Sequence, residues 1–409
     1  MGRLKILLLV FDGLGDRPVT ELGHKTPLEA ANKPTLDWFA QNGISGLLDP
    51  IAPGVRPGSD TSHLALLGYD PFEVYTGRGP FEAAGVGIEV QKGDIAFRGN
   101  FVTVDGDRKI VDRRAGRIRE GTDELAKSLD GLKLGRVKAL FRAGTEHRAA
   151  LVLRGKGLSP KVSDTDPHET GLEVLEAMPL EPRAKATAKA VNLFTDKAFE
   201  LLADHAVNRA RTAKGEPAAN LVVFRGAGIV PHLEPFPERH GLKSAGIAGV
   251  ALIRGICRAL GIDVLEANGA TGGLDTDMIA KADKALEALA SYDFVFVNVK
   301  ATDLCGHDGK ASEKIRVIDR LDQMMAHVKS QLAEDVLVAI TADHSTPVAL
   351  KEHSGDPVPL TIFGEGIHVD DVQRFDERSV ARGGLGRIRG LDLMPVLLSA
   401  ANRAEKFGA

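Results

Sequence analysis

Residues 336–347 read VLVAITADHSTP, an apolar run that ends in an acid–histidine pair, Asp343 and His344. The run does not alternate with polar residues, which is typical of a strand buried on both faces of a parallel sheet. In such sheets ligands bind beyond the carboxyl ends of the strands. The stretch therefore predicts a buried parallel strand whose end contributes to a functional site.

Similar runs recur along the chain and are separated by helical patterns. Apolar runs at residues 6–11, 221–224 and 294–299 are predicted to be further buried parallel strands. Helices are predicted at residues 244–260, 277–290 and 313–332. Strands that alternate with helices indicate an α/β fold with a doubly wound, mostly parallel sheet.

The length of 409 residues is too great for one ordinary core and predicts two domains. Residues 93–112 resemble a hairpin with a DGD turn, residues 133–153 add short strands, and residues 184–210 are helical. These elements indicate a smaller α+β domain, residues 81–240, inserted into a discontinuous core formed by residues 1–80 and 241–409.

Composition narrows the class of protein. Fifty-two basic residues against 56 acidic ones give a net charge of −4, which argues against nucleic-acid binding as the main function. The two cysteines, Cys257 and Cys305, form no CxxC pair, so a reducing cytoplasm is expected. The apolar run at residues 6–11 is too short for a signal peptide, and no stretch is long enough to cross a membrane. Oligomeric state cannot be read from the sequence.

Two of the strand ends carry potential metal ligands. Asp12 closes the first strand in LLLVFDG and could project into a crevice as a ligand or simply cap a turn. In KATDLCGHDG, Asp303 and His307 are four residues apart, so on a helical turn they face the same way. A carboxylate and an imidazole on one face suit manganese or zinc, although a capping aspartate beside an unrelated histidine is an equally good interpretation.

The third strand end is harder to explain without a site. His353 follows nine residues after His344, and Asp343 directly precedes His344. A strand would send the side chains of Asp343 and His344 to opposite faces, whereas the loop after a strand can turn both inward. A capping role would explain Asp343 but neither histidine.

A candidate nucleophile lies in RPGSDTSHLALLG. Ser59 stands at the predicted start of a helix, where serine is most often an N-cap. The functional interpretation is that the helix N-terminus and a neighbouring metal ion activate its hydroxyl and favour an incoming phosphate. His63, one turn further along, is a candidate to orient Ser59.

Taken together, these residues match a two-metal phosphoryl-transfer site. Such a site needs three or four ligands for each ion, one ion to activate a nucleophile and the other to neutralise phosphate charge. The candidate ligands are three acids, three histidines and one serine: Asp12, Ser59, Asp303, His307, Asp343, His344 and His353.

The chain also resembles the archaeal-type cofactor-independent phosphoglycerate mutases, nearly from end to end. The motifs that carry the resemblance are FDGLGD, PGSDTSHLALLGYDP, TGRGPFEAAG, NFVTVDGDRKIVDRRAGRI, SDTDPHETG, HGLKSAGIAGVALIRGICRALG, KATDLCGHDG and TADHSTP. The resemblance implies an alkaline-phosphatase-like α/β core and the interconversion of 3-phosphoglycerate and 2-phosphoglycerate in glycolysis and gluconeogenesis.

The resemblance further implies that Ser59 is phosphorylated and then rephosphorylates bound glycerate, so that no 2,3-bisphosphoglycerate is needed. It assigns the ligands to two divalent ions: Asp12, Ser59, Asp343 and His344 to one, and Asp303, His307 and His353 to the other. Manganese is the expected ion, and the ligand set would also accept zinc, cobalt or magnesium.

The inserted domain is expected to bind the small-molecule substrate and to close so that water is excluded. Candidate substrate-binding residues are His147, Arg148, Asp164, Asp166, Arg225 and Lys243, and Arg78 is a further possibility. The alternative for each is ordinary surface charge or a turn-stabilising aspartate.

Three other functions use the same features. A metal-dependent phosphomonoesterase would pass the phosphoryl group to water, and a homoserine-kinase-like phosphotransferase would use another acceptor and depend on ATP. A metal-stabilised binding protein would show no turnover. Release of free phosphate, dependence on ATP, and complete inactivity with metal bound distinguish these alternatives.

Overall fold

The structure is a computed structural model that describes residues 2–406 and 408. The chain divides into two compact units. The first is formed by the chain up to Tyr75 and from Leu233 onward, and the second by Thr76–His232. The chain therefore leaves the first unit, forms the second, and returns to complete the first.

The first unit is built on an eight-stranded sheet. Every neighbouring pair is parallel except the two pairs that β13 makes. The strand order across the sheet is β10 (Asp263–Val264), β9 (Ser244–Ile247), β11 (Phe294–Val299), β1 (Lys5–Phe11), β12 (Val336–Thr341), β13 (Val358–Phe363), β2 (Ile44–Asp49) and β14 (Gly386–Arg389). The predicted mostly parallel, doubly wound sheet is confirmed.

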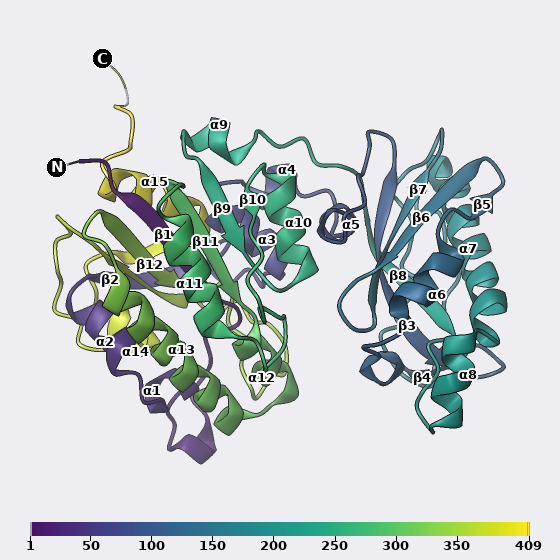
Figure 1. Ribbon diagram of the computed structural model, residues 1–409, viewed down its shortest axis with the longest axis horizontal. Helices are drawn as coiled ribbons and strands as arrows, with labels where there is room; N and C mark the ends of the chain where they lie inside the picture. The colour runs from purple at the N-terminus through teal and green to yellow at the C-terminus, as the bar shows by residue number, and fades with distance from the viewer. Residues whose placement is uncertain (1, 407, 409) are drawn as a thin grey trace. The chain divides into compact units, whose positions relative to one another are not determined.

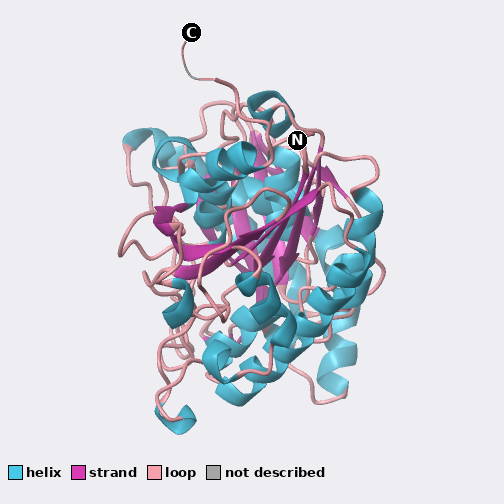
Figure 2. Cartoon of the chain, turned by 90° about the vertical axis from the view of Figure 1, so that its left-hand side faces the viewer, coloured by secondary structure: helices cyan, strands magenta, loops and turns pink. Residues whose placement is uncertain are grey.

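Helices cover both faces of this sheet, as Figure 2 shows. One group packs around α13 (Ala311–Gln331) and includes α1 (Pro27–Ala30), α2 (Pro34–Gln41), α11 (Met278–Ala288) and α12 (Ala301–Asp308). The other packs around α3 (Ser59–Leu66) and includes α4 (Pro71–Val74), α10 (Ala251–Ala259) and α15 (Gly390–Ala400). Short helices η1 (Thr20–Leu22), α9 (Phe236–His240) and α14 (Glu377–Val380) complete the unit. Two helix layers explain why β11 and β12 are buried along their whole length.

The second unit has an antiparallel sheet of six strands. They are β3 (Ile95–Val104), β4 (Ile110–Asp112), β5 (Lys133–Leu134), β6 (Val137–Ala143), β7 (Arg148–Arg154) and β8 (Leu221–Gly228). The helices are α5 (Gly79–Gly85), η2 (Ala115–Arg117), α6 (Thr122–Leu129), η3 (Pro182–Ala184), α7 (Lys185–Ala203) and α8 (Ala206–Ala213). Its core contains Phe101, Phe141, Phe194 and Phe224, which pack edge to face or tilted in succession along the sheet and α7.

Two predictions about elements are wrong. Residues 221–224 do form a buried strand, but β8 pairs antiparallel with β3 in the second unit. Residues 244–260 are not one helix, because the first four form β9 beside β11 and only Ala251–Ala259 form α10. Small residues in SAGI carry no clear helical or strand period, so the sequence does not mark this boundary.

Among the described residues, none of the helices combines the length and the apolar character needed to cross a membrane.

Candidate active site

The sheet brings the predicted ligands of the first unit together at one edge. Strand β1 pairs in parallel with both β11 and β12, with Phe11 beside Val299 and Val10 beside Thr341. The residues that follow these three strands therefore emerge at the same place. They are Asp12 after β1, Asp303 on α12 after β11, and Asp343 with His344 after β12.

Two glycines allow the connections to approach one another closely. Gly13 has a φ of 67°, and a Cβ there would lie 2.6 Å from the Cα of Asp303. A Cβ on Gly306 would lie 2.3 Å from the carbonyl oxygen of Thr346. A side chain at either position would push α12 away from the neighbouring loops. The glycines of FDG and LCGH therefore serve the geometry of the site.

Three carboxylates are buried at this edge. Asp12 is fully buried, and its Oδ2 accepts a hydrogen bond from Asn298 at 3.3 Å. Asp303 accepts one from the Thr346 hydroxyl at 2.8 Å. Asp343 accepts one from the Gly13 backbone N–H at 3.0 Å, but its Oδ2 has no hydrogen-bond partner although it is buried. A buried carboxylate oxygen that accepts no hydrogen bond is costly, which fits a position where a cation binds.

The three predicted histidine ligands all present Nε2 to these acids. Nδ1 of His307 lies 3.0 Å from the Lys351 carbonyl oxygen, and Nδ1 of His353 lies 2.8 Å from the Pro57 carbonyl oxygen. Both nitrogens must donate there, so both Nε2 atoms are free to accept or to bind a metal. Each of these Nε2 atoms lies 3.4 Å from Asp303 Oδ1.

The His344 ring also turns Nε2 toward the carboxylates. Its Nδ1 lies 3.0 Å from the Thr346 hydroxyl. Its Nε2 lies 3.2 Å from Asp343 Oδ2 and 3.5 Å from Asp12 Oδ1. Anchoring one ring nitrogen while the other faces carboxylates is the arrangement that orients metal-binding histidines.

Ser59 is the first residue of α3, and Gly58 rather than Ser59 is the N-cap. The Ser59 hydroxyl therefore does not cap the helix, and it lies 3.1 Å from His344 Nε2. His63 lies behind it, with Nδ1 2.6 Å from the Ser59 carbonyl oxygen. The hydroxyl is thus directed at the acid–histidine cluster, at a helix N-terminus that favours an anion.

Lys300 belongs to this cluster, although sequence reasoning missed it. It directly follows β11, and its Nζ lies 2.7 Å from Asp12 Oδ1 and 2.7 Å from Asp303 Oδ2. Burial would lower the pKa of Lys300, but Asp12, Asp303 and Asp343 outweigh burial and raise it. The only sequence signal was its place between a buried strand and Asp303 in KATD.

The charges of the site are strongly coupled. Burial raises the pKa of Asp12, and the carboxylate of Asp343 raises it further. Burial opposes ionisation of Asp303 as well, but Lys300 and the histidines hold its pKa well below its usual range. Burial would lower the pKa of His344, whereas Asp343 and Asp12 raise it. The acids therefore depend on nearby cations for their charge.

Within the part of the chain that the structure describes, three groups of side chains at this site could hold a metal ion. They are Asp12, Asp343 and His344; Asp303, His344 and His353; and His307, Glu352 and His353. The groups share members, and the first two are largely buried. This set of oxygen and nitrogen donors, in which Asp343 Oδ2 accepts no hydrogen bond, fits divalent metal ions.

The second unit gathers another kind of cluster. Arg98 on β3 lies opposite Arg225 on β8, and Arg98 is buried with its Nε lacking a hydrogen bond. Burial lowers the pKa of Arg98 well below its usual range, and Arg78, Arg225 and Arg148 lower it further. The carboxylate of Glu82 lies 3.9 Å from the Arg98 Nε. Sequence reasoning missed Arg98, although a charged residue inside the apolar strand run IAFRGNF is a signal of function.

The remaining candidates of the second unit border this cluster. His147 is buried with Nδ1 lacking a hydrogen bond, and burial together with Arg148 and Arg98 lowers its pKa to about 3. Asp166 is buried, accepts from Arg113 at 3.0 Å, and contributes a favourable charge beside Arg225. Asp164 is more exposed, and it accepts the Gly226 backbone N–H at 3.1 Å. The structure therefore places His147, Arg148 and Arg225 near Arg98, and Asp166 near Arg225.

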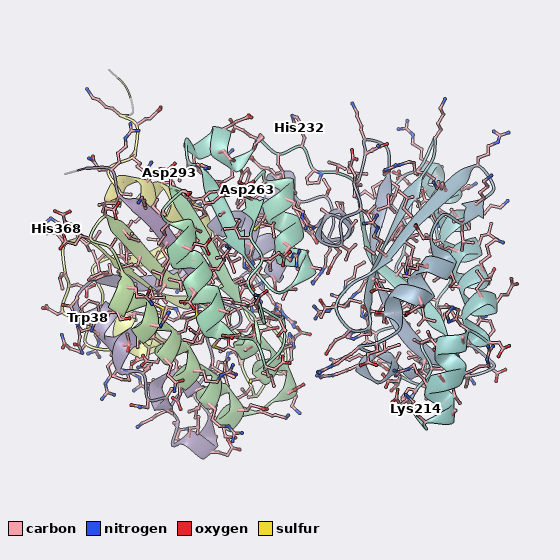
Figure 3. The ribbon with its side chains drawn as sticks, viewed as in Figure 1. Trp38, Lys214, His232, Asp263, Asp293 and His368 are labelled. Atoms are coloured by element: carbon pink, nitrogen blue, oxygen red, sulfur yellow. The ribbon has the colours of Figure 1, made fainter. Side chains whose placement is uncertain are left out.

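Lys243 lies elsewhere. It precedes β9, so it is at the amino ends of the parallel strands, whereas the acids and histidines follow the carboxyl ends. Its backbone N–H donates to Asp293, which Figure 3 labels in the upper part of the unit, while α12 lies in the lower part in Figure 1. Its ammonium group lies over the Tyr292 ring, 4.7 Å from the centroid. Within the first unit, Lys243 therefore lies at the edge of the sheet opposite the acids and histidines.

Fold and site together define an α/β enzyme with a buried cluster able to hold metal ions beside a serine hydroxyl. Residues 40–208 match the model of the family described as 2,3-bisphosphoglycerate-independent phosphoglycerate mutase. The chain is 49% identical to 2,3-bisphosphoglycerate-independent phosphoglycerate mutase 1 of Methanothermobacter thermautotrophicus, over 99% of this chain and 100% of the relative. It is 50% identical to the 2,3-bisphosphoglycerate-independent phosphoglycerate mutase of Ignicoccus hospitalis, over the full length of both.

Solved structures agree with these relatives. The cofactor-independent phosphoglycerate mutase of Thermoplasma acidophilum is 39% identical, with a TM-score of 0.69 over 97% of this chain and 100% of that chain. The PH0037 protein of Pyrococcus horikoshii is 42% identical, with a TM-score of 0.86 over the whole of both chains. The chain belongs to the family of 2,3-bisphosphoglycerate-independent phosphoglycerate mutases, and the resemblance inferred from its motifs is confirmed.

Proposed function

We propose that this mutase interconverts 3-phosphoglycerate and 2-phosphoglycerate through a phosphoserine at Ser59. The observation that carries the proposal is the position of the Ser59 hydroxyl, 3.1 Å from His344 Nε2 at the start of α3. This contact turns the Ser59 hydroxyl toward the acids and histidines. Family membership supports the mutase reaction, and the position of the Ser59 hydroxyl supports a phosphoserine intermediate.

The proposed ligands for two divalent ions are those of the sequence analysis: Asp12, Ser59, Asp343 and His344, and Asp303, His307 and His353. Manganese is the proposed ion, with zinc, cobalt or magnesium as substitutes. When bound, such ions would lower the pKa of the Ser59 hydroxyl and neutralise phosphate charge. His307 and His353 are already held by backbone carbonyls with Nε2 free, so few side chains need to reorient.

In the proposed reaction Ser59 Oγ loses its proton and attacks phosphorus in line. The bond from phosphorus to the substrate oxygen breaks, and that oxygen takes up a proton, which leaves phosphoserine and glycerate. The other hydroxyl of glycerate then loses its proton and attacks phosphorus, the bond from phosphorus to Ser59 Oγ breaks, and Ser59 Oγ takes up a proton. The partial positive charge at the N-terminus of α3 stabilises the Ser59 oxyanion and the phosphoryl group.

The arginine cluster of the second unit is proposed to bind the substrate carboxylate. Guanidinium groups pair with carboxylates in a bidentate geometry, and the cluster has more cations than acids nearby. Arg98, Arg148 and Arg225 are the proposed donors, and His147 is held neutral as a hydrogen-bonding neighbour. Asp166, and to a lesser degree the more exposed Asp164, would keep Arg225 in place.

A coupled assay tests this proposal. Conversion of 3-phosphoglycerate to 2-phosphoglycerate is measured with added manganese, without bisphosphoglycerate, and with EDTA as a control, while free phosphate is followed in parallel. Ser59→Ala should abolish conversion, and Ser62→Ala is the matched control because its hydroxyl donates only to backbone carbonyls of the same helix start. Conversion by Ser59→Ala above a trace would reject the phosphoserine route. Release of phosphate in place of mutase flux would favour a phosphomonoesterase.

A further inference from the structure

Lys300 makes contacts that neither a packing role nor a surface role explains. Its side chain is 11% exposed, and its Nζ bonds to Asp12 at 2.7 Å and contacts Asp303 at 2.7 Å. The same Nζ also donates to Ser59 Oγ at 3.4 Å. One ammonium group therefore touches the nucleophile and the two acids that are proposed to bind different ions.

The position of Lys300 is fixed by the fold. It follows the last residue of β11 and is the N-cap of α12, so its backbone is held at the carboxyl edge of the sheet. Asn298, two residues before Lys300, is also buried and contacts both Asp12 and His63. The Lys281 ammonium group donates a hydrogen bond to the Asn298 carbonyl oxygen at 3.0 Å. A lysine on such a rigid support is directed into the site and cannot swing out to water without loss of these contacts.

The net charge of the metal-loaded site indicates the role of the Lys300 ammonium group. The three buried acids of the site carry three negative charges, fewer than the four positive charges of two divalent ions. Lys300 adds a further positive charge, so the loaded site needs an anion. The reaction brings one, because the phosphoryl group is transferred to Ser59 Oγ, the atom that Lys300 already contacts.

We propose that Lys300 is a catalytic residue that donates a hydrogen bond to the transferred phosphoryl group at Ser59. The inference rests on the proposed function, since it requires a phosphoryl group on Ser59. Lysine suits the role because its ammonium is a compact cation with three donors that can move from a carboxylate to a phosphoryl oxygen without a change in backbone. No bond to Lys300 forms or breaks, and Lys300 keeps its proton throughout.

Lys300→Met tests the proposal in the full-length, manganese-loaded enzyme. We expect two ions per chain, as in the native enzyme, with kcat reduced by roughly 100-fold, the usual effect of losing one preorganised donor. Binding of inorganic phosphate, measured by calorimetry, should weaken roughly tenfold or more, as for a lost charged hydrogen bond. Lys310→Met is the matched control, because Lys310 is exposed and pairs only with acids of its own segment.

Two outcomes would overturn the role. A kcat within about threefold of the native value with both ions bound would mean that Lys300 only occupies space that an ion takes over. Loss of an ion in parallel with activity would mean that Lys300 positions metal ligands and does not touch the phosphoryl group.

If Lys300→Met does not fold, Lys300→Arg serves instead, because it keeps the charge. We expect phosphate binding within a few-fold of native and a lower kcat, since a planar guanidinium cannot replace the compact donor, and a native kcat would refute the role. Ser59→Ala separates the two levels of inference. Activity that survives Ser59→Ala rejects the phosphoserine itself, whereas activity that needs Ser59 but not Lys300 rejects only the role of Lys300.

Discussion

Glu377 at the start of α14 links two segments near the candidate site, and its protonation should control the stability of the first unit. Its carboxyl accepts the Asp16 backbone N–H at 3.1 Å and the Thr26 hydroxyl at 2.8 Å. Asp16 lies four residues beyond Asp12 in the loop that follows β1. Burial raises the pKa of Glu377 from 4.5 to about 7, although these hydrogen bonds and the nearby Lys314 act to lower it.

Ionisation of Glu377 destabilises the folded protein relative to the unfolded chain. Because the pKa is higher in the folded protein than in the unfolded chain, folding favours the protonated carboxyl. The stabilisation is fully present below pH 4.5 and is lost as the pH rises through about 7. The difference between these pKa values corresponds to about 3 kcal/mol. Since the Glu377 side chain is partly exposed, water screens part of this stabilisation, and we expect it to amount to about 2 kcal/mol.

Glu377→Gln removes the titration while keeping the shape, since the amide can accept from Asp16 and donate to Thr26. We expect the variant to gain stability relative to the native protein between pH 5 and pH 8.5, by roughly 4–8 °C in Tm. Differential scanning fluorimetry at both pH values, with manganese held constant, measures this difference. The exposed Glu365→Gln is the control and should show no such gain. An equal Tm difference for Glu377→Gln at both pH values would refute the reasoning.

Three further predictions concern single charges. Asp303→Asn should remove one equivalent of bound manganese, measured by elemental analysis, and lower kcat by roughly 100-fold or more, because a neutral amide cannot balance the charge of the cations around it. Two ions bound to this variant would contradict the assignment of Asp303 as a ligand. Arg225→Met should raise KM for phosphoglycerate by roughly 10–100-fold, the effect of losing a charged hydrogen bond, with the metal content unchanged. An unchanged KM would show that Arg225 does not bind the substrate. Lys314→Met should lower the free energy of unfolding by roughly 3–5 kcal/mol in denaturant titrations, because Asp16, 2.8 Å from Lys314, would stay buried without its partner. A loss below about 1 kcal/mol would show that water or another cation replaces the Lys314 ammonium group.

The strand ends of the first unit could be predicted because continuous apolar runs identify strands buried on both faces. Asp12, Asp303 and Asp343 each follow such a run, and parallel strands bring their carboxyl ends to one edge. The helical spacing of Asp303 and His307 also matches the structure, where both lie on α12. These inferences needed only local periodicity and the direction of parallel strands.

Features that depend on strand pairing could not be predicted. Arg98 meets Arg225 only because β3 pairs with β8, more than a hundred residues later in the chain. The apolar run of β8 looks the same in a parallel and in an antiparallel sheet, so its partner cannot be inferred from hydropathy. Lys243 was chosen from its motif, but it stands before β9 rather than after it and so lies at the other edge. Lys300 was overlooked because a lysine beside acids usually indicates a solvated surface.

The most direct test of the central claim is to look for phosphate on Ser59 during turnover. Manganese-loaded enzyme is mixed with 3-phosphoglycerate, quenched in acid within the steady state, digested and analysed by mass spectrometry. Phosphate is predicted on the peptide that contains Ser59, and it should be absent with EDTA and in Ser59→Ala. Mutase flux at the native rate, with no phosphorylated Ser59 at any quench time, would contradict the phosphoserine route.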